Sequence, residues 1–533
     1  MTAPDDGSGA PTAPSLAPRA IGIAAVIIMC GNLTTSLLGF VRQAVMSHTF
    51  GAHSVQTDAF VAASVVPQIF YDLTIGAAVS AALIPTLSLM LEKEGKEAVA
   101  RLSGAVLGLA WSILALLVIV LLVAAHPVMA LFLQAGGNKH PGELARSVTL
   151  VRILVPSLFF LGTSAVFLAT LYSLRRFTVS AFATAFFHIG IIAGAVLLAR
   201  PLGIEGMAVG AVAGAAVQAL VQVPALWRAG VRLRVRVALT PEVRGVLRLY
   251  APVALGLLVS VGGQVIDLNF KAQLETGAIT SMSIATTLTQ FPIGIAVAAL
   301  SFAILPSLSL SASPAQLDNF KETLTFGLRL VFFLTIPAAI AYLSLGVPII
   351  RLLFQHGHFT AADTTRTASA LFGYAPQIPF VGIDQLLIFA FYARKNTRTP
   401  MLIGVVGVGI YVASALVLRP TLHVFGLALA NTLQNSLHGL ILLVLLILSI
   451  GTLRGYELAP SIGRTCLAGS AMALTAGLAS HVLQSTTSAN LAVRFSQVAV
   501  PTLSAIVVYV VAAAALRSRE LAVLIAIGRR AVT

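Results

Sequence analysis

The sequence predicts an all-α fold: a polytopic membrane protein of about 14 transmembrane helices, with two six-helix lobes in parallel repeat plus two extra C-terminal helices. Composition is the first reason for this prediction. Of 533 residues, 58% are hydrophobic and only 10% are charged, and the mean hydropathy is +0.96. A soluble domain cannot bury so much apolar surface. The other two reasons are a series of long apolar segments and an internal repeat.

Fourteen apolar segments are close to, or longer than, the roughly 20 residues that a helix needs to cross a bilayer. In chain order they cover residues 21–47, 57–90, 102–126, 147–173, 178–199, 204–227, 246–269, 279–310, 322–346, 366–393, 400–418, 423–450, 461–484 and 495–516. The segment 57–90 is longer than one straight span, so we expect it to be kinked or strongly tilted.

Three short sequences recur later in the chain, in the same order and at nearly one offset. LIPTLSL (83–89) returns as LPSLSL (305–310), and PVMALFLQAG (127–136) returns as PIIRLLFQHG (348–357), both displaced by 221 residues. GMAVG (206–210) returns as GLALA (426–430), displaced by 220. Each copy holds six spans, and this even number gives both lobes the same orientation, a parallel repeat typical of transporters with a substrate site between their halves. The VMALFLQ and IIRLLFQ pieces are too short to span and are expected as interfacial helices on the outer side.

Basic residues gather on one side of the predicted topology. The N-terminus, the even-numbered loops and the C-terminus hold 23 of the 33 Lys and Arg residues, the odd-numbered loops hold nine, and Arg42 is the remaining one. This asymmetry predicts that both termini are cytoplasmic. The densest cluster, at 228–248, is best explained by this topology and by attraction to anionic lipid headgroups, and not by nucleic-acid binding.

These features divide the chain into six parts. They are a disordered N-terminal tail (1–20), an N-lobe with helices 1–6 (21–228), a basic cytoplasmic loop (229–245), a C-lobe with helices 7–12 (246–450), helices 13–14 (451–516) and a basic C-terminal tail (517–533).

Enzymatic and cofactor motifs are not found in this sequence. It contains no Walker A, Rossmann or nucleophile-elbow pattern, and its ten histidines show no metal-ligand spacing. We therefore expect a protein that is not an enzyme and has no cofactor, no metal and no nucleic-acid partner. Cys30 and Cys466 lie in apolar segments and are expected as small core residues, without a disulfide.

Arg42 is the residue that most suggests a function. It lies within the first apolar segment, and no acidic residue lies within a helical turn on either side of it. A charge at membrane depth costs a few kcal/mol, about 2.5–3.5 on insertion scales, so such residues usually face a cavity and a ligand. The alternative is that the side chain extends to the membrane interface, since the predicted helix ends nearby.

Four stretches resemble one family of transporters. GFVRQAVMSHTFGAHSVQTDAF (39–60), LYSLRRFTVSAFATAFFHIGIIAGAVLL (171–198), FPIGIAVAALSFAILPSLS (291–309) and FGYAPQIPFVGIDQLLIFAFYARKNTRTP (372–400) look like the MurJ (MviN) lipid II flippases of the MOP superfamily. The resemblance covers about residues 21–450.

This resemblance implies a function and a location. The function is transport of lipid II, the undecaprenyl-pyrophosphate-linked peptidoglycan precursor, from the inner to the outer leaflet by alternating access, for cell-wall synthesis. Helices 13 and 14 would form a groove for the lipid tail. The location is the bacterial inner membrane, with membrane lipids, the lipid-linked substrate and cell-wall synthesis proteins as partners.

The resemblance also implies candidate site residues. Arg42 matches the arginine of the family's G-F-V-R block, and a planar guanidinium suits a pyrophosphate. Asp58 matches the acidic residue of T-D-A-F, where it has either a substrate or gating role or caps the second helix. Gln43 follows Arg42, at a position where many relatives carry Asp.

Other positions depart from the family pattern. Tyr71 and Asp72 stand where the family has paired arginines, and Gly76 and Ala77 replace a following acidic residue and glycine. Thr287 replaces an arginine, and Asp384 replaces a basic residue. Most of the family's cationic cavity is therefore missing.

Two residues at the end of the seventh predicted helix bear on what replaces the missing arginines. Asp267 and Lys271 are four residues apart, hence on one helix face, and can form an ion pair. Lys271 either replaces a lost arginine or only neutralises Asp267.

Three aspartates in predicted spans leave open a second class of function, that of a cation-coupled exporter. They are Asp72, Asp267 and Asp384. Carboxylates at membrane depth bind cations and protons, as in a cation-coupled small-molecule exporter of the same superfamily. A flippase for another polyprenyl-linked glycan and a scaffold for cell-envelope assembly are further alternatives.

Overall fold

The computed structural model describes residues 18–76, 82–134, 142–303, 308, 311, 316–453, 455–484 and 491–532. All the regular secondary structure in these residues is helical. The helices of the first half are α1 (Pro18–Phe50), α2 (Val55–Tyr71), the π-helix η1 (Asp72–Gly76), α3 (Ile84–Glu94), α4 (Lys96–Val123), α5 (Ala125–Gln134), α6 (Glu143–Leu154), α7 (Ser157–Ser173), α8 (Thr178–Ala183), α9 (Ala185–Leu197), α10 (Ala199–Leu202), α11 (Glu205–Leu220) and α12 (Val223–Arg228). The second half contains α13 (Pro241–Ala272), α14 (Ala278–Ala303), α16 (Leu317–Phe354), α17 (Ala361–Tyr374), the short 3₁₀ helix η4 (Ala375–Gln377), α18 (Ile378–Ala393), α19 (Arg398–Ile450), α20 (Leu458–Gln484), α21 (Leu491–Ala515) and α22 (Arg519–Val532).

Each of the fourteen predicted spans falls on one helix or on a broken helix. In the described residues the predicted segment 57–90 is not one regular α-helix, because α2 gives way to the π-helix at Asp72 and α3 begins at Ile84; its kink or strong tilt stays a prediction. The spans predicted at 400–418 and 423–450 both lie in α19, which bends at His423, a residue with non-helical backbone angles. By length and hydropathy alone, eight of the described helices can cross a membrane, or nine if the bent pair α6 and α7 counts as one span.

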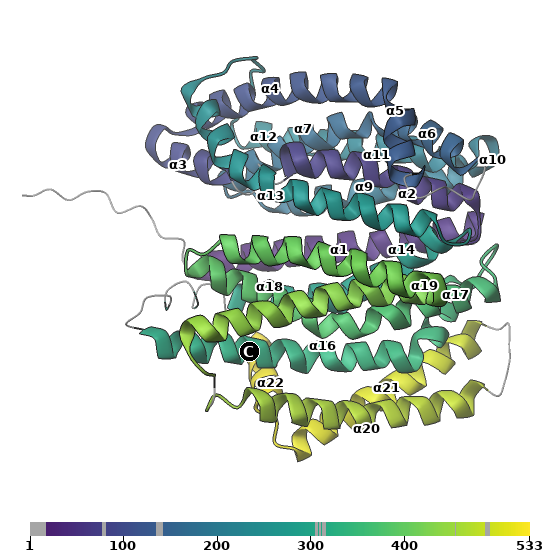
Figure 1. Ribbon diagram of the computed structural model, residues 1–533. Coiled ribbons are helices and arrows are strands. Elements are labelled where there is room, and N and C mark those ends of the chain that lie inside the picture. The colour runs from purple at the N-terminus through teal and green to yellow at the C-terminus, as the bar shows by residue number, and fades with distance from the viewer. Residues whose placement is uncertain are drawn as a thin grey trace, which may run out of the picture.

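The helices form two stacked lobes (Figure 1). The helices from α2 to α12 make up the upper half of the view, α16 to α19 lie below them, and α20 to α22 lie outermost at the bottom. Between the lobes, α1 contacts α8 and α9 on one side and α14 and α16 on the other, while α13 contacts both α5 and α19. Cys30 and Cys466, expected in the core, are both exposed and carry free thiols.

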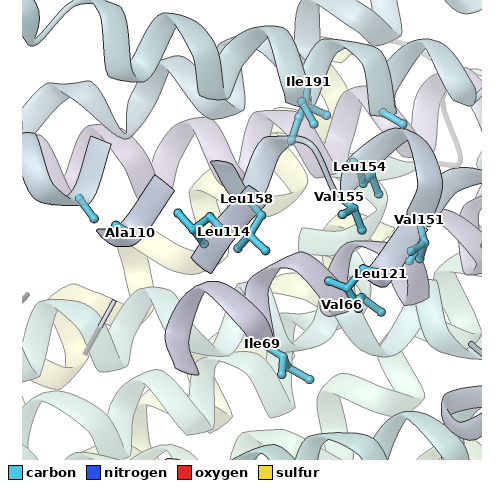
Figure 2. Close-up of a cluster of buried hydrophobic side chains, with 14 of the residues drawn as sticks. Val66, Ile69, Ala110, Leu114, Leu121, Val151, Leu154, Val155, Leu158 and Ile191 are labelled. Atoms are coloured by element: carbon cyan, nitrogen blue, oxygen red, sulfur yellow. The ribbon is translucent and has the colours of Figure 1, made fainter. Parts of the chain in front are cut away.

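The interior of the N-lobe is filled by branched aliphatic side chains from successive helices. Figure 2 shows Val66 and Ile69 of α2, Leu114 of α4, Leu158 of α7 and Ile191 of α9 converging on one cluster. In a bilayer this packing stabilises helix association mainly through van der Waals contacts, because lipid tails are as apolar as the side chains. The cluster gives the lobe a fixed shape on which the polar residues are placed.

Helices α9 and α11 of the N-lobe approach each other closely, and glycines make this approach possible. A Cβ at Gly190 would lie 2.4 Å from the Gly210 carbonyl oxygen, and one at Gly194 would lie 2.2 Å from that of Gly206. Glycines four residues apart on both helices leave two facing grooves, so the backbones touch directly.

The two short pieces predicted as interfacial helices differ from each other. VMALFLQ lies in α5, a separate ten-residue helix. The prediction for IIRLLFQ is wrong, because Ile349 to Phe354 continue α16, which runs unbroken for 38 residues through Pro337 and Pro348. The repeat in sequence therefore does not extend to this detail of structure.

The segment that joins the lobes is held against the N-lobe. Residues 231–240 have no regular secondary structure, and the Arg236 amide donates to the Gly104 carbonyl oxygen of α4 over 3.3 Å. A Cβ at Gly104 or Gly108 would lie 2.3 Å from the carbonyl oxygen of Arg234 or Arg236. These two glycines thus provide the groove in which the connector lies.

The segment predicted as a basic C-terminal tail forms the helix α22, and a buried ion pair ties it to the C-lobe. The Arg329 Nε atom lies 2.5 Å from the Glu520 Oε1 atom. Ser461 of α20 and Ser518 also donate to the Glu520 carboxylate, over 2.8 and 2.7 Å. Helices α16, α20 and α22 therefore meet at one carboxylate.

Candidate functional site

A cavity of about 250 Å³ lies between the N-lobe and the first two helices of the C-lobe. Its polar lining includes Arg42 and Gln43 of α1, Gln68 of α2, Gln264 of α13 and Ser283 of α14. Apolar residues of α2, α6, α7, α9 and α11 complete the wall. Of the seven predicted site residues, Arg42 and Gln43 belong to this lining.

Arg42 is half-buried in the cavity wall. No described residue forms a hydrogen bond or an ion pair with its guanidinium. Helix α1 continues to Phe50, so eight residues, about 12 Å of helix, separate Arg42 from the end of α1. This distance argues against extension of its side chain to the nearer interface.

Two further polar groups of the cavity wall lack a described partner. Gln43 is only 2% exposed and Ser157 only 1%, yet the Gln43 Nε2 and Ser157 Oγ atoms have no hydrogen bond to a described residue. A buried donor without a partner costs about 1–3 kcal/mol. Together with Arg42, these groups are arranged for a ligand that accepts hydrogen bonds.

Asp58 joins the two lobes. Its carboxylate accepts from the amides of Gly277 and Thr280, over 2.5 and 2.8 Å, and from the Thr280 hydroxyl over 2.6 Å. These groups form the N-terminus of α14, whose unpaired amides and positive dipole end favour a carboxylate. Asp58 therefore caps a helix of the other lobe. The prediction that it caps its own helix is wrong, because the Ser54 hydroxyl caps α2 by accepting from the Gln56 amide.

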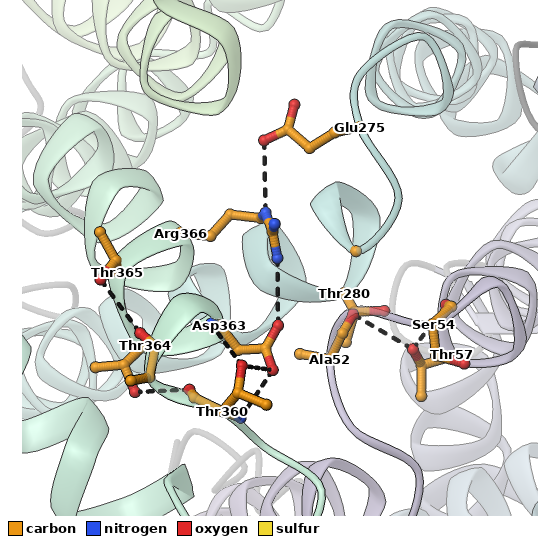
Figure 3. Close-up of polar contacts among 12 residues, drawn as sticks. Ala52, Ser54, Thr57, Glu275, Thr280, Thr360, Asp363, Thr364, Thr365 and Arg366 are labelled. Atoms are coloured by element: carbon orange, nitrogen blue, oxygen red, sulfur yellow. Dashed lines mark hydrogen bonds and ion pairs between the residues drawn. The ribbon is translucent and has the colours of Figure 1, made fainter.

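Glycines and charges surround the Asp58 contact at the same end of the molecule. A Cβ at Gly277 would lie 2.8 Å from the Ala52 carbonyl oxygen, and one at Gly357 would lie 2.4 Å from that of His48. Figure 3 shows Arg366 between Glu275 and Asp363, with Ala52 and Thr280 nearby; the distances from Arg366 to the two carboxylates are 3.5 and 3.2 Å. We call the Asp58 contact, Gly277 and Gly357 the lobe junction.

The predicted pairing of Asp267 with Lys271 is confirmed. The Lys271 Nζ atom lies 2.6 Å from the Asp267 Oδ2 atom, and the Tyr411 hydroxyl donates to the Oδ1 atom, also over 2.6 Å. Since Asp267 neutralises Lys271, this lysine is not a free cation in place of a lost arginine.

The other two aspartates also have partners. Gln68, a cavity residue, donates to both Asp72 carboxylate oxygens over 3.1 and 3.2 Å. The His438 Nδ1 atom lies 2.7 Å from the Asp384 Oδ1 atom, with the side chains 13% and 22% exposed. Sequence reasoning missed His438, because its only signal was a polar residue in an apolar helix and its partner is 54 residues away.

Comparison with known proteins places these features in a family. The family described as lipid II flippase MurJ matches residues 46–501. A probable lipid II flippase MurJ of Vibrio cholerae is 30% identical over 431 residues, covering 78% of this chain and 80% of the relative. A lipid II flippase MurJ of Burkholderia cenocepacia is 29% identical over 422 residues, covering 77% and 81%.

Solved structures agree on the fold. A lipid II flippase MurJ in an inward closed conformation superposes with a TM-score of 0.76 at 22% identity, covering 92% of this chain and 98% of that one. An inward-facing multidrug resistance MATE family transporter of the MOP superfamily gives 0.67 at 14% identity, covering 81% and 99%. The family match spans most of the chain and includes Asp58 and the C-lobe carboxylates. This chain belongs to the MurJ family of lipid II flippases.

Proposed function

We propose that this protein flips lipid II from the inner to the outer leaflet by alternating access, for peptidoglycan synthesis. The observation that carries the proposal is Arg42, an arginine without a described partner in a cavity between two lobes. Membership of a family of lipid II flippases supports the choice of substrate.

The cavity groups suit a diphosphate. Arg42 donates two parallel hydrogen bonds to phosphate oxygens, a geometry that a lysine cannot reproduce. Gln43 and Ser157 add neutral donors that have no described partner. A ligand that accepts from all three removes their desolvation cost, so binding is favoured without a ring of further arginines.

Two of the carboxylates at membrane depth have described hydrogen-bond partners. Asp72 is bonded by Gln68, and Asp384 is paired with His438. A protonated His438 neutralises Asp384 and so lowers its repulsion of an anionic substrate, whereas the neutral Gln68 orients the Asp72 carboxylate and leaves its charge in place.

The lobe junction supports a role for Asp58 in alternating access. Its contacts with the N-terminus of α14 hold the lobes together at one end. Opening at that end requires the carboxylate to leave those donors, and closing restores them. Asp58 is then a gating residue and not a direct ligand of the substrate.

The charge count supports cytoplasmic termini in the inner membrane, which makes the lobe junction the outer end. Asp384 and His438 are a candidate site for a coupling proton, the feature that a cation-coupled exporter would also need. The comparisons with lipid II flippases favour lipid II over an exported small molecule or another polyprenyl-linked glycan.

Complementation tests the proposal. Expression in a bacterium depleted of its own lipid II flippase should restore growth and cell shape, and the Arg42→Ala variant should not. Normal membrane levels of the wild-type protein without rescue would contradict the proposal.

A further inference from the structure

A second cavity, of about 180 Å³, lies away from the central one. It is lined by Arg176, Thr178 and Val179 at the start of α8 and by Ala225, Arg228 and Ala229 at the end of α12. None of these residues lines the central cavity. The cavity lies at the end of the N-lobe from which the basic connector 231–240 leaves.

The side chains of the two cations of this cavity have no partner in the described part of the chain. Both side chains are exposed, and neither the Arg176 nor the Arg228 guanidinium makes an ion pair or a hydrogen bond with any residue that the structure describes. Two arginines of like charge at one cavity repel each other, so an anion between them is favourable. A hydroxyl, that of Thr178, lies in the same lining.

The backbone turn that carries Arg176 is rigid. The Arg175 and Arg176 amides donate to the carbonyl oxygens of Tyr172 and Leu171 over 3.0 and 2.8 Å, and the Phe177 ring packs edge-on against Tyr172. Arg175 has a φ of +59°, a region that favours glycine and costs other residues about 1 kcal/mol or more. The turn thus fixes the backbone from which the exposed Arg176 side chain extends.

The C-lobe repeats this turn but uses it differently. Lys395, 220 residues after Arg175, has a φ of +60°, and the Asn396 amide donates to the Phe391 carbonyl oxygen over 2.9 Å. Asn396 stands where the N-lobe has Arg176, and its side chain is bonded to Thr399. The residue equivalent to Arg228 is Leu448, which is 76% exposed. The repeat therefore keeps the turn but has two free arginines in the N-lobe alone.

We propose that this N-lobe cavity binds the phosphate group of a membrane lipid. Arg176 and Arg228 bind the phosphate oxygens as forks, with Thr178 as a neutral donor. Val179 is 37% exposed and Trp227, beside Arg228, is 65% exposed; such apolar and aromatic surface next to cations is typical of the membrane interface. This lipid site is separate from the substrate cavity at Arg42.

Native mass spectrometry of the full chain tests the site with phosphatidylglycerol, phosphatidylcholine and inorganic pyrophosphate as probes. The double variant Arg176→Gln/Arg228→Gln should bind phosphatidylglycerol at least ~10-fold more weakly at the tightest site, since each arginine contributes a charge-assisted bond. Phosphatidylcholine, which has no net charge, should be little affected. The phosphatidylglycerol affinity of the variant Arg176→Lys/Arg228→Lys should lie between those of the wild type and the double glutamine variant.

The controls separate this site from others. Arg232→Gln removes an exposed arginine of the nearby connector outside the cavity lining and should leave the tightest site intact. Arg42→Ala should also leave it intact while abolishing complementation, so failure of the flippase proposal does not affect this test. Equal phosphatidylglycerol binding by wild type and the double variant, or tight binding of pyrophosphate in place of the lipid, would overturn the proposal.

Discussion

At the scale of single residues, Arg42 has a solvation cost that only a ligand or water can offset. Its guanidinium is half-buried and has no described protein partner. Arg42→Ala should abolish complementation without loss of protein, and Arg42→Lys should restore it only in part, because a single ammonium lacks the fork. Growth after depletion of the host flippase measures complementation, and immunoblots of membranes measure the protein level. Full activity of Arg42→Ala would remove this residue from the binding site.

Lys271 is expected to act through Asp267 and not through the substrate. Lys271→Met leaves a carboxylate without its cation, and because the pair is only partly buried the cost should lie below that of a fully buried pair, about 3–5 kcal/mol. The double variant Asp267→Asn/Lys271→Met should recover most of this loss, and thermal unfolding in detergent gives both values. If the double variant stayed as unstable as the single one, while transport failed in both, a direct role for Lys271 would be indicated instead.

At the scale of helices, the α9–α11 contact depends on glycines that have no room for a side chain. A Cβ at Gly210 would lie 2.3 Å from the Gly190 carbonyl oxygen, whereas one at Gly477 of α20 would meet no atom within 4 Å. Gly210→Ala should therefore lower stability by about 1–3 kcal/mol, and Gly477→Ala should be neutral or slightly stabilising. Thermal unfolding of the two variants tests this, and equal melting temperatures would contradict the close approach of α9 and α11.

The capping of α14 by Asp58 sets how firmly the lobe junction stays closed. Asp58→Asn removes the charge from three hydrogen bonds, each worth about 1.5–3 kcal/mol when an ionised group takes part. The closed population should fall about tenfold or more. Spin labels at the exposed positions 149 of α6 and 361 of α17 should show longer distances, with Asp318→Asn, an exposed aspartate of α16, as control. Unchanged distances in Asp58→Asn would show that other contacts hold the junction.

At the scale of the whole molecule, the charge asymmetry predicts which side each end faces. In a cysteine-free background, a cysteine at residue 236 of the connector should be shielded from a membrane-impermeant reagent added to intact cells. A cysteine at residue 361, at the start of α17, should react. The reverse pattern would place both termini outside.

Apolar length, charge and repeat predicted the fold well because each is a local property or a comparison of short segments. The fourteen segments fall on helices in the described part of the chain, and eight or nine helices there have the length and hydropathy to cross a membrane. The Asp267 and Lys271 pair was also predictable, since residues four apart share a helix face. The capping of α14 by Asp58 was not, because its partners lie 219 and 222 residues away and depend on how the lobes pack. The continuation of α16 through Pro348 was missed because the piece after this proline is too short to span by itself, and a proline inside a helix usually ends or kinks it.

The connector between the lobes limits how they move. Its anchor at Arg236 lies five residues before Pro241, where α13 begins, so the free chain reaches at most about 18 Å. The lobe junction lies at the other end of α13, 32 residues or about 48 Å of helix away. The connector therefore sets an upper limit on the distance between the lobes at its own end, and this limit does not apply at the lobe junction. In a transport cycle, the lobes can separate only as far as the connector allows at its end. At the lobe junction this connector does not limit their separation.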